Sequence, residues 1–116
     1  MTAPEAVDSV RSIDALLAGL ADPTRRRIVE LLGDRPRRVG ELAGELAVSP
    51  SRMSRHLKVL RDCRLVEESS PDFDARIRIY SLRSGATAEL RRWLDRMEQG
   101  WSEQLLALKA HVEGGR

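Results

Sequence analysis

Apolar residues recur at helical intervals in two neighbouring segments in the middle of the chain. In the first segment they follow the i, i+3, i+4, i+7 spacing of one helical face: Val39, Leu42, Ala43 and Leu46. In the second segment Met53, Leu57 and Leu60 fall together on one face. Because only a few residues separate the two segments, the pattern predicts two short helices joined by a tight turn that Val48 fills.

The second of these helices has a clear start and a polar outer face. Ser49 is a suitable N-cap, and Pro50 suits the first helical position because the N–H that proline lacks would be unpaired there. The face opposite the apolar one carries small polar and basic side chains: Ser51, Arg52, Ser54, Arg55 and Lys58. Two such helices form a helix-turn-helix, which reads DNA in the major groove, so these five residues are the candidates for facing DNA.

The five candidates differ in what they can bind. Arginine bonds in a bidentate manner to O6 and N7 of guanine, so we expect Arg52 and Arg55 to read bases. Serine and lysine more often contact phosphate, which is the role expected of Ser51, Ser54 and Lys58. The alternative is a solvated basic face without a ligand. The preceding helix, the short turn and the strands that follow make that alternative the weaker interpretation.

Two further helices precede this pair. Apolar spacing predicts a helix over about residues 4–20. Asp22 followed by Pro23 repeats the N-cap and proline pattern and predicts a second helix, which ends at Gly33. Residues 34–38 are expected to form a polar connector to the helix-turn-helix.

Two strands follow the helix-turn-helix. Residues 65–70 and 76–82 are rich in residues that favour strands, and residues 71–75 are suited to the turn of a hairpin between them. A hairpin in this place is a wing. The predicted fold is therefore mainly α with a small β-hairpin wing (α+β), a winged helix-turn-helix with the order α-α-α-α-β-β-α.

Charged residues flank the tip of the predicted wing. Arg76 and Arg78 are placed to contact backbone phosphates or the minor groove. Asp72 and Asp74 lie at the tip itself and argue against deep insertion into a groove.

A long apolar stripe on the last predicted helix, residues 86–112, exceeds what a domain of this size can cover. The alternative is that this stripe packs on the first helix of the same chain. We expect both that packing and a two-fold dimer made by the terminal helices, about residues 4–20 and 86–112. The interface residues expected are Leu16, Leu20, Trp93, Met97, Trp101, Leu105 and Leu108.

Positive charge concentrates on the predicted DNA-reading segment. The 116 residues suit a single domain, residues 1–116, and carry a net charge of only +2. Residues 22–65, however, hold eleven Lys or Arg against six Asp or Glu, a local charge of +5. This asymmetry is expected of an electrostatic DNA footprint. Arg25, Arg26 and Arg27 fall in the first turn of a helix, where the helix dipole disfavours cations, so either a phosphate lies nearby or they form a solvated face.

Composition excludes several other classes of function. A single cysteine rules out an internal disulfide and any Cys-x-x-Cys zinc site. No nucleophile elbow, phosphate loop, dinucleotide fingerprint or metalloprotease motif occurs, so we expect no enzyme, no cofactor and no metal site. The N-terminus has no apolar run typical of a signal peptide or membrane span, which makes the cytoplasm the default location and a membrane partner unexpected.

Three side chains have a potentially reactive or titratable group outside these patterns. Cys63 ends the second helix of the pair, where burial as a small core residue is the favoured interpretation and oxidation sensing the alternative. His56 falls at the edge of the apolar face and is expected to pack or to touch a phosphate. His111 lies near the chain end and is expected to be solvated.

Three stretches together resemble a known family. They are residues 20–28 (Leu-Ala-Asp-Pro-Thr-Arg-Arg-Arg-Ile), residues 54–61 (Ser-Arg-His-Leu-Lys-Val-Leu-Arg) and residues 78–82 (Arg-Ile-Tyr-Ser-Leu). Their order and spacing resemble the ArsR family of bacterial winged-helix repressors. The resemblance implies a homodimer that binds a palindromic operator, represses transcription, often of its own operon, and is released by an effector.

The chain departs from parts of the family pattern. Metal-sensing members carry a Cys-x-Cys where this chain has residues 38–40, and the last helix holds only His111 of the expected Asp and His pairs, so the chain looks more like the metal-independent branch. Pro50, Arg52 and Arg64 also differ from the family's usual residues, so the operator cannot be inferred from the family. Because the usual glycine is missing, Arg64 is expected either to adopt a strained left-handed backbone or to end the helix differently.

Two classes of function remain after these exclusions. The leading hypothesis is a sequence-specific DNA-binding regulator, a homodimeric repressor of a palindromic operator, with an unknown effector. The alternative is a winged-helix module that uses its exposed tryptophan stripe to bind another protein.

Overall fold

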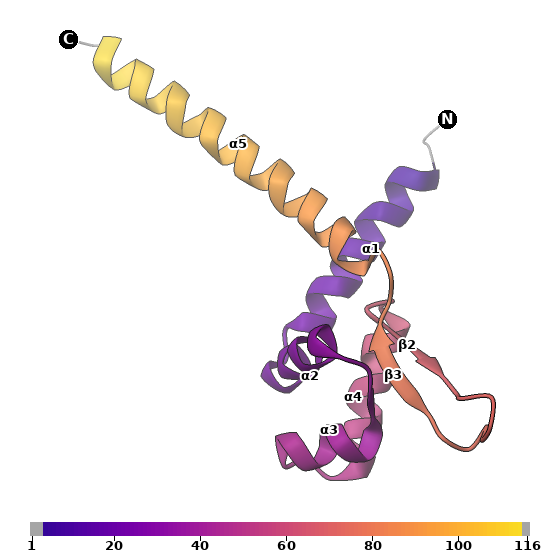
Figure 1. The fold of residues 1–116 in the computed structure, drawn as a ribbon. Helices are drawn as coiled ribbons and strands as arrows, with labels where there is room; N and C mark the ends of the chain where they lie inside the picture. Colours follow the sequence, from indigo (N-terminus) through magenta and orange to yellow (C-terminus); the bar gives the residue numbers. More distant parts are fainter. Residues whose placement is uncertain (1–3, 115–116) are drawn as a thin grey trace.

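The computed structural model describes residues 4–114, with side chains from residue 12 onward. Figure 1 shows α1 and α5 leaving one end of the body, α3 and α4 at the opposite end, and the loop between β2 and β3 extending to one side. The predicted class, mainly helical with a small wing, is confirmed. In chain order the elements are α1 (Pro4–Leu20), α2 (Pro23–Asp34), β1 (Arg37–Arg38), α3 (Val39–Leu46), α4 (Pro50–Asp62), β2 (Val66–Ser69), β3 (Ile79–Leu82) and α5 (Ala86–Gly114).

Side-chain caps fix where two of the helices begin. The Asp22 carboxylate accepts the backbone N–H of Arg25 at 3.1 Å at the start of α2. The Ser49 hydroxyl accepts the backbone N–H of Arg52 at 3.3 Å at the start of α4. In both helices proline follows the cap, where its missing donor costs nothing. Both predicted starts are confirmed.

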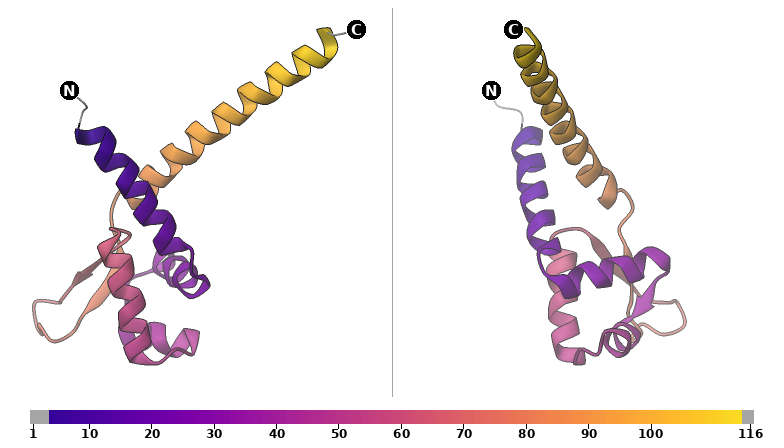
Figure 2. Two further views of the ribbon diagram at one scale, coloured as in Figure 1. Left: turned by 180° about the vertical axis from the view of Figure 1, so that it is seen from behind. Right: turned by 90° about the vertical axis from the view of Figure 1, so that its left-hand side faces the viewer.

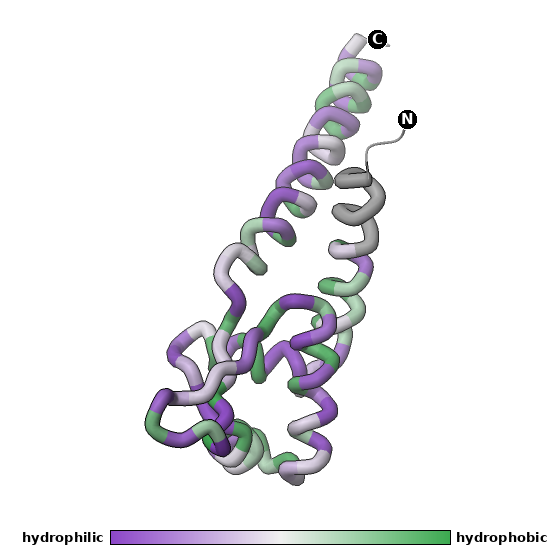
Figure 3. Tube along the Cα trace, turned by 90° about the vertical axis from the view of Figure 1, so that its right-hand side faces the viewer, coloured by the Kyte–Doolittle hydropathy of each residue, from purple (hydrophilic) through white to green (hydrophobic). Residues whose placement is uncertain are grey.

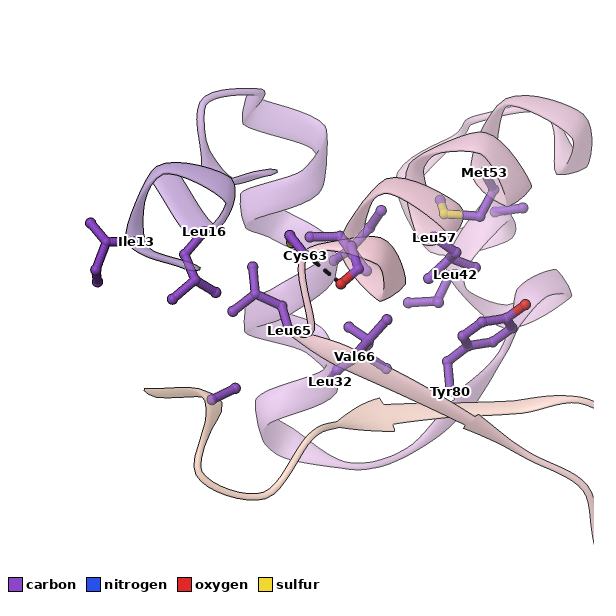
Figure 4. Close-up of a cluster of buried hydrophobic side chains, with 14 residues drawn as sticks. Ile13, Leu16, Leu32, Leu42, Met53, Leu57, Cys63, Leu65, Val66 and Tyr80 are labelled. Atoms are coloured by element: carbon purple, nitrogen blue, oxygen red, sulfur yellow. Dashed lines mark hydrogen bonds between the residues drawn. The ribbon is translucent and has the colours of Figure 1, made fainter. Parts of the chain in front are cut away.

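The core lies where α3 and α4 meet α2 and the sheet. Met53, Leu57 and Leu60 are fully buried, as the helical spacing predicted, and Leu42 of α3 packs among them. Figure 4 shows Met53, Leu57 and Leu42 beside Tyr80 of β3, with the side chains of β2 and α1 further along the same cluster. Since a buried leucine or methionine contributes about 1.5–3 kcal/mol, this cluster fixes the position of α4. The other core residues are Ile13, Leu16, Ile28, Leu32, Ala43, Cys63, Leu65, Val66, Tyr80 and Ala86.

The sheet has a third strand that the sequence pattern did not predict. β1 pairs antiparallel with β3, Arg37 opposite Tyr80, and the sheet order is β1-β3-β2. Two consecutive arginines show neither alternation nor strand-forming residue types, so the predicted polar connector and the predicted order were wrong at this place. The strand exists because β3 offers a free edge to the backbone of residues 37–38.

The wing has shorter strands and a longer loop than predicted. β3 begins at Ile79 rather than at Arg76, because local bonds occupy the preceding backbone. Asp74 accepts the backbone N–H of Arg76 through its carboxylate at 2.9 Å and that of Ile77 through its carbonyl at 3.2 Å. These turns at Asp74 keep residues 74–77 out of the ladder.

Two helix ends follow local backbone rules. α2 continues past the predicted stop at Gly33 to Asp34, and Arg35 then turns extended because Pro36 follows it. After α4, Arg64 adopts a φ of 64°, the left-handed conformation expected where the usual glycine is missing. A non-glycine residue there costs roughly 1–2 kcal/mol.

α5 gives the molecule its elongated shape, with principal extents of 71 × 39 × 20 Å. Its first turns lie against α1, where the Ser12 hydroxyl donates to the Glu89 carboxylate at 2.9 Å. Its second half extends away from the body in every view (Figure 2), and the side chains of residues 101–114 are all exposed. None of the described helices is both long and apolar enough to cross a membrane.

Candidate nucleic-acid interface

The outer face of α4 presents the five predicted DNA-facing residues. Ser51, Arg52, Ser54, Arg55 and Lys58 are all exposed, while the opposite face of the helix is buried. Within the described part of the chain, none of the three cations forms an ion pair. Their charges are therefore available to an anionic partner without breaking an internal contact.

The turn between α3 and α4 holds the start of α4 at the end of the molecule opposite the two chain termini (Figure 2). Ala47 adopts the left-handed conformation at a φ of 52°, and the Val48 amide donates to the Ala43 carbonyl at 3.0 Å. This bond pairs a backbone carbonyl at the end of α3, and the left-handed residue turns the chain into α4. Val48 is half-buried against the core, as expected. The helix-turn-helix is thus a preorganised unit.

The two predicted wing arginines both carry ion pairs within the chain. Arg76 is exposed and pairs with Asp74, with its Nε 3.2 Å from the carboxylate oxygen. Arg78 is exposed and pairs with Glu68. The tip between the strands carries Phe73, whose side chain is one of the most exposed large apolar groups of the protein.

Glu68 connects the wing to α4. Its carboxylate accepts the Tyr80 hydroxyl at 2.8 Å, Arg61 Nη1 at 2.7 Å and a bond from Arg78. The Tyr80 hydroxyl, together with Arg78 and Arg61, holds the pKa of the Glu68 carboxyl below its usual value. Sequence reasoning missed this cluster, since its members come from three different elements.

A second cluster orients α3 relative to α2. Arg37 is only 6 % exposed and donates to the Leu31 carbonyl at 3.3 Å, to the Asp34 carboxylate at 3.3 Å and to Glu45. Its guanidinium therefore bridges the end of α2 to the last turn of α3. A buried arginine needs this number of partners, because an unpaired buried charge is costly.

The arginines at the start of α2 take two different environments. Arg25 Nε donates to the Gly19 carbonyl at 2.7 Å and Arg26 Nη1 donates to the Leu20 carbonyl at 2.8 Å, so both satisfy the C-terminal end of α1. Arg27 is exposed. The sequence signal for a special role, cations in a first helical turn, was present, but their carbonyl partners were not predictable from it.

The residues expected at a dimer interface divide into three groups. Leu16 is only 1 % exposed and belongs to the core of its own chain, so the expectation that it meets a second chain does not hold for this side chain. Leu20, Trp93 and Met97 are half-buried, and the first two pack against that core. The exposed members of the predicted set are Trp101, Leu105 and Leu108, each about 60 % exposed or more.

Cys63 is buried and its thiol donates to the Leu60 carbonyl at 3.4 Å. Burial raises the pKa of the Cys63 thiol, so little of the reactive thiolate is present at neutral pH. This favours the packing role over oxidation sensing. Among residues whose side chains are described, no three His, Cys, Asp or Glu side chains gather into a group that could hold a metal ion.

Comparison with known sequences agrees with this geometry. A sequence model described as "Bacterial regulatory protein, arsR family" matches residues 22–68, from the cap of α2 into β2. The HTH-type transcriptional regulator Rv2034 of Mycobacterium tuberculosis is 42% identical over 99 residues, which make up 85% of this chain and 87% of that protein. The family and this relative are regulators of transcription rather than enzymes.

Solved structures agree over most of the chain. An ArsR-like transcriptional regulator from Rhodococcus sp. RHA1 matches with a TM-score of 0.76 at 28% identity, covering 88% of this chain and 93% of that one. HlyU from Vibrio cholerae matches with a TM-score of 0.61 at 31% identity, covering 76% and 92%. The chain therefore belongs to the ArsR family of bacterial regulatory proteins and is a transcriptional regulator whose DNA-binding helix-turn-helix is formed by α3 and α4.

Proposed function

We propose that the protein is a repressor that binds a palindromic operator as a homodimer, with α4 of each protomer in the major groove. The single observation that supports this most strongly is the outer face of α4, where exposed cations and hydroxyls stand on a rigid helix. A helix of this kind fits the width of the major groove, about 12 Å. Two-fold symmetry then requires inverted half-sites about one helical turn apart.

Within this proposal the side chains of α4 make two kinds of contact, to base edges and to phosphates. Arg52 and Arg55 read guanine edges, because a guanidinium can donate two parallel bonds to O6 and N7. Ser51, Ser54 and Lys58 contact phosphates and fix the register. Arg76 and Arg78 on the wing add phosphate contacts when they exchange their carboxylate partners for DNA.

The second half of α5 supports the dimer. Trp101, Leu105, Leu108 and Val112 recur at helical spacing, and each is about 60 % exposed or more. Figure 3 shows hydrophobic positions recurring along this part of α5, beyond the reach of the body. An apolar stripe of this length is stable in water only against a partner, and a second copy of α5 offers the same stripe. Leu17 of α1 is also exposed.

The gene under control is proposed to include the protein's own, since the family often represses its own operon. The direct test is fluorescence anisotropy of the purified protein with DNA from immediately upstream of its gene and with a scrambled duplex, each at two salt concentrations. Preference for the upstream duplex, with affinity falling steeply with salt, supports the proposal. Equal binding to both duplexes contradicts autoregulation. Affinity that does not change with salt favours a protein-binding module instead.

A further inference from the structure

A basic hollow lies on the flank of α4, between that helix and the start of α2, and borders two of the five residues assigned to the groove. It has a volume of about 180 Å³ and is lined by Arg25, Arg52, Arg55, His56 and Val59. Four of its five lining residues carry nitrogen donors, and no carboxylate lines it. Cations gathered in this way repel each other unless an anion lies among them.

Backbone carbonyls at the end of α1 fix the position of the Arg25 guanidinium. Its Nε donates to the Gly19 carbonyl at 2.7 Å and its Nη2 to the Ala18 carbonyl at 3.3 Å, both at the end of α1. The Asp22 carboxylate caps α2 by accepting the Arg25 backbone N–H, and among the described residues it forms no ion pair with the guanidinium. The Arg25 charge is therefore fixed in position and uncompensated by an ion pair among the described residues.

His56 is oriented by Arg25. Arg25 Nη1 lies 3.4 Å from His56 Nδ1, and because a guanidinium can only donate, Nδ1 must accept. The ring proton of the neutral imidazole then resides on Nε2, which becomes a further donor. Arg25 thus contributes its own charge and also fixes the tautomer of its neighbour.

We propose that this hollow binds one backbone phosphate of the DNA strand that borders the major groove entered by α4. The inference rests on the proposed DNA-binding function. A phosphate at this point is contacted from α2 through Arg25 and from α4 through His56, so it locks the angle of α4 in the groove. Such a contact sets orientation and not sequence preference. The same chemistry would admit a free phosphate or a phosphorylated small molecule.

The test uses the full-length protein and the duplex that it prefers, prepared with a neutral methylphosphonate at one backbone position at a time. Arg25→Gln removes the anchored charge, and His56→Leu keeps the bonds of Arg25 to α1 in case the first variant unfolds. The matched controls are Arg83→Gln, which also loses a charge and a guanidinium bond to a backbone carbonyl, and His111→Leu, which removes the other histidine. Thermal unfolding reports the folded fraction of each variant.

We expect the wild type to lose about tenfold in affinity when one phosphate per half-site is neutralised, the size of a charge-assisted hydrogen bond. Arg25→Gln and His56→Leu should each bind the unmodified duplex about tenfold more weakly than the wild type. Neutralising that phosphate should then cause no further loss of affinity in either variant. The ratio of the affinities for preferred and scrambled DNA should not change in these variants. Both control variants should bind DNA as the wild type does.

Two results would overturn the inference without touching the proposed function. One is that Arg25→Gln or His56→Leu still loses affinity whenever a phosphate to which the wild type is sensitive is neutralised. The other is unchanged DNA binding by both variants together with saturable stabilisation of the wild type, and not of Arg25→Gln, by inorganic phosphate, which would assign the hollow to a free anion. Failure of the wild type to bind any duplex would overturn both proposals.

Discussion

At the scale of single residues, the closest approach between α1 and the end of α4 is made by Gly19 and Cys63. A Cβ built on Gly19 would lie 2.8 Å from Cys63 Sγ, nearer than two such atoms can pack. Glycine is used here for its lack of a side chain and not for backbone freedom, because the residue is helical. The contact explains why a glycine is retained within a helix, where it costs about 1 kcal/mol relative to alanine.

Gly19→Ala is predicted to destabilise the protein by about 1–3 kcal/mol, since the added methyl group overpacks a buried site. Urea denaturation measures the effect. The matched background is Cys63→Ala, which removes the sulfur atom that the methyl group would meet. In that background the same Gly19→Ala change should cost much less, and an equal cost in both backgrounds would show that the contact is not responsible.

Substitutions of Arg55 and Lys58 on α4 can distinguish base reading from phosphate binding. Arg55→Ala is predicted to cost about 1–3 kcal/mol on the preferred duplex and to relax specificity at one base pair. Lys58→Ala should weaken binding to all sequences alike and reduce the salt slope by about one unit per protomer. Anisotropy titrations on preferred and scrambled duplexes measure both variants. Equal losses on the two duplexes for Arg55→Ala would refute its base-reading role.

Sequence patterns predicted the burial, exposure and capping of the α4 residues well, because these properties follow from position on one helix. Periodicity alone separates Met53 and Leu57 from Arg55, and local chemistry alone identifies Ser49 as a cap. The hollow was only partly predictable. Helix position offered a phosphate contact as one of two alternatives for Arg25 and for His56, but their approach to each other joins residues 31 positions apart. No local pattern encodes such a distance.

At the scale of elements, the wing and α4 are coupled through Glu68. Tyr80 reaches this carboxylate from β3 and Arg61 reaches it from α4, so one side chain sets the angle between the two candidate DNA contacts. Its environment favours the charged form, as the lowered pKa of Glu68 indicates. β1 escaped prediction for a related reason, because the partner of Arg37–Arg38 is a strand about forty residues further along the chain.

Glu68→Gln is predicted to lower the free energy of unfolding by about 1–3 kcal/mol at neutral pH, since it leaves two arginines without their carboxylate. Because the pKa of Glu68 is lower in the folded state, its contribution is fully present above the pKa of the unfolded chain and is lost as pH falls through the folded-state value. The difference between wild type and variant should therefore shrink towards zero in acid.

Urea denaturation of both proteins from neutral to acidic pH checks this prediction. Other carboxylates with lowered pKa values, such as Asp22 and Asp74, change equally in the two proteins and cancel in the difference. A difference that stays constant down to the lowest pH would contradict the assignment of the ion-pair cluster to Glu68.

At the scale of the whole molecule, the candidate DNA-binding helix and the proposed dimer interface lie far apart. α3 and the start of α4 lie at one end of the molecule, and the second half of α5 extends from the other (Figures 1 and 2). A two-fold axis between the α5 helices would relate two copies of α4. The dimer would then set the distance between half-sites, so the loss of the dimer should weaken DNA binding as well.

Trp101→Glu is predicted to weaken dimerisation by more than a hundredfold. The substitution replaces an aromatic side chain that the proposed dimer buries with a charged one in both protomers. Sedimentation velocity over a range of protein concentrations measures the change. Gln99→Glu adds the same charge to a polar position of α5 and should leave the dimer intact. Dimers of Trp101→Glu as stable as those of the wild type would contradict an interface on this stripe.

The central claim, that two copies of α4 read one symmetric site, is tested most directly by selecting bound duplexes from a random pool with the wild-type protein. The account predicts enrichment of an inverted repeat whose half-sites are centred about one helical turn, roughly 34–36 Å, apart, with guanines at positions that Arg55→Ala no longer selects. A pool that remains random after selection, or one enriched in a single asymmetric half-site, would contradict it.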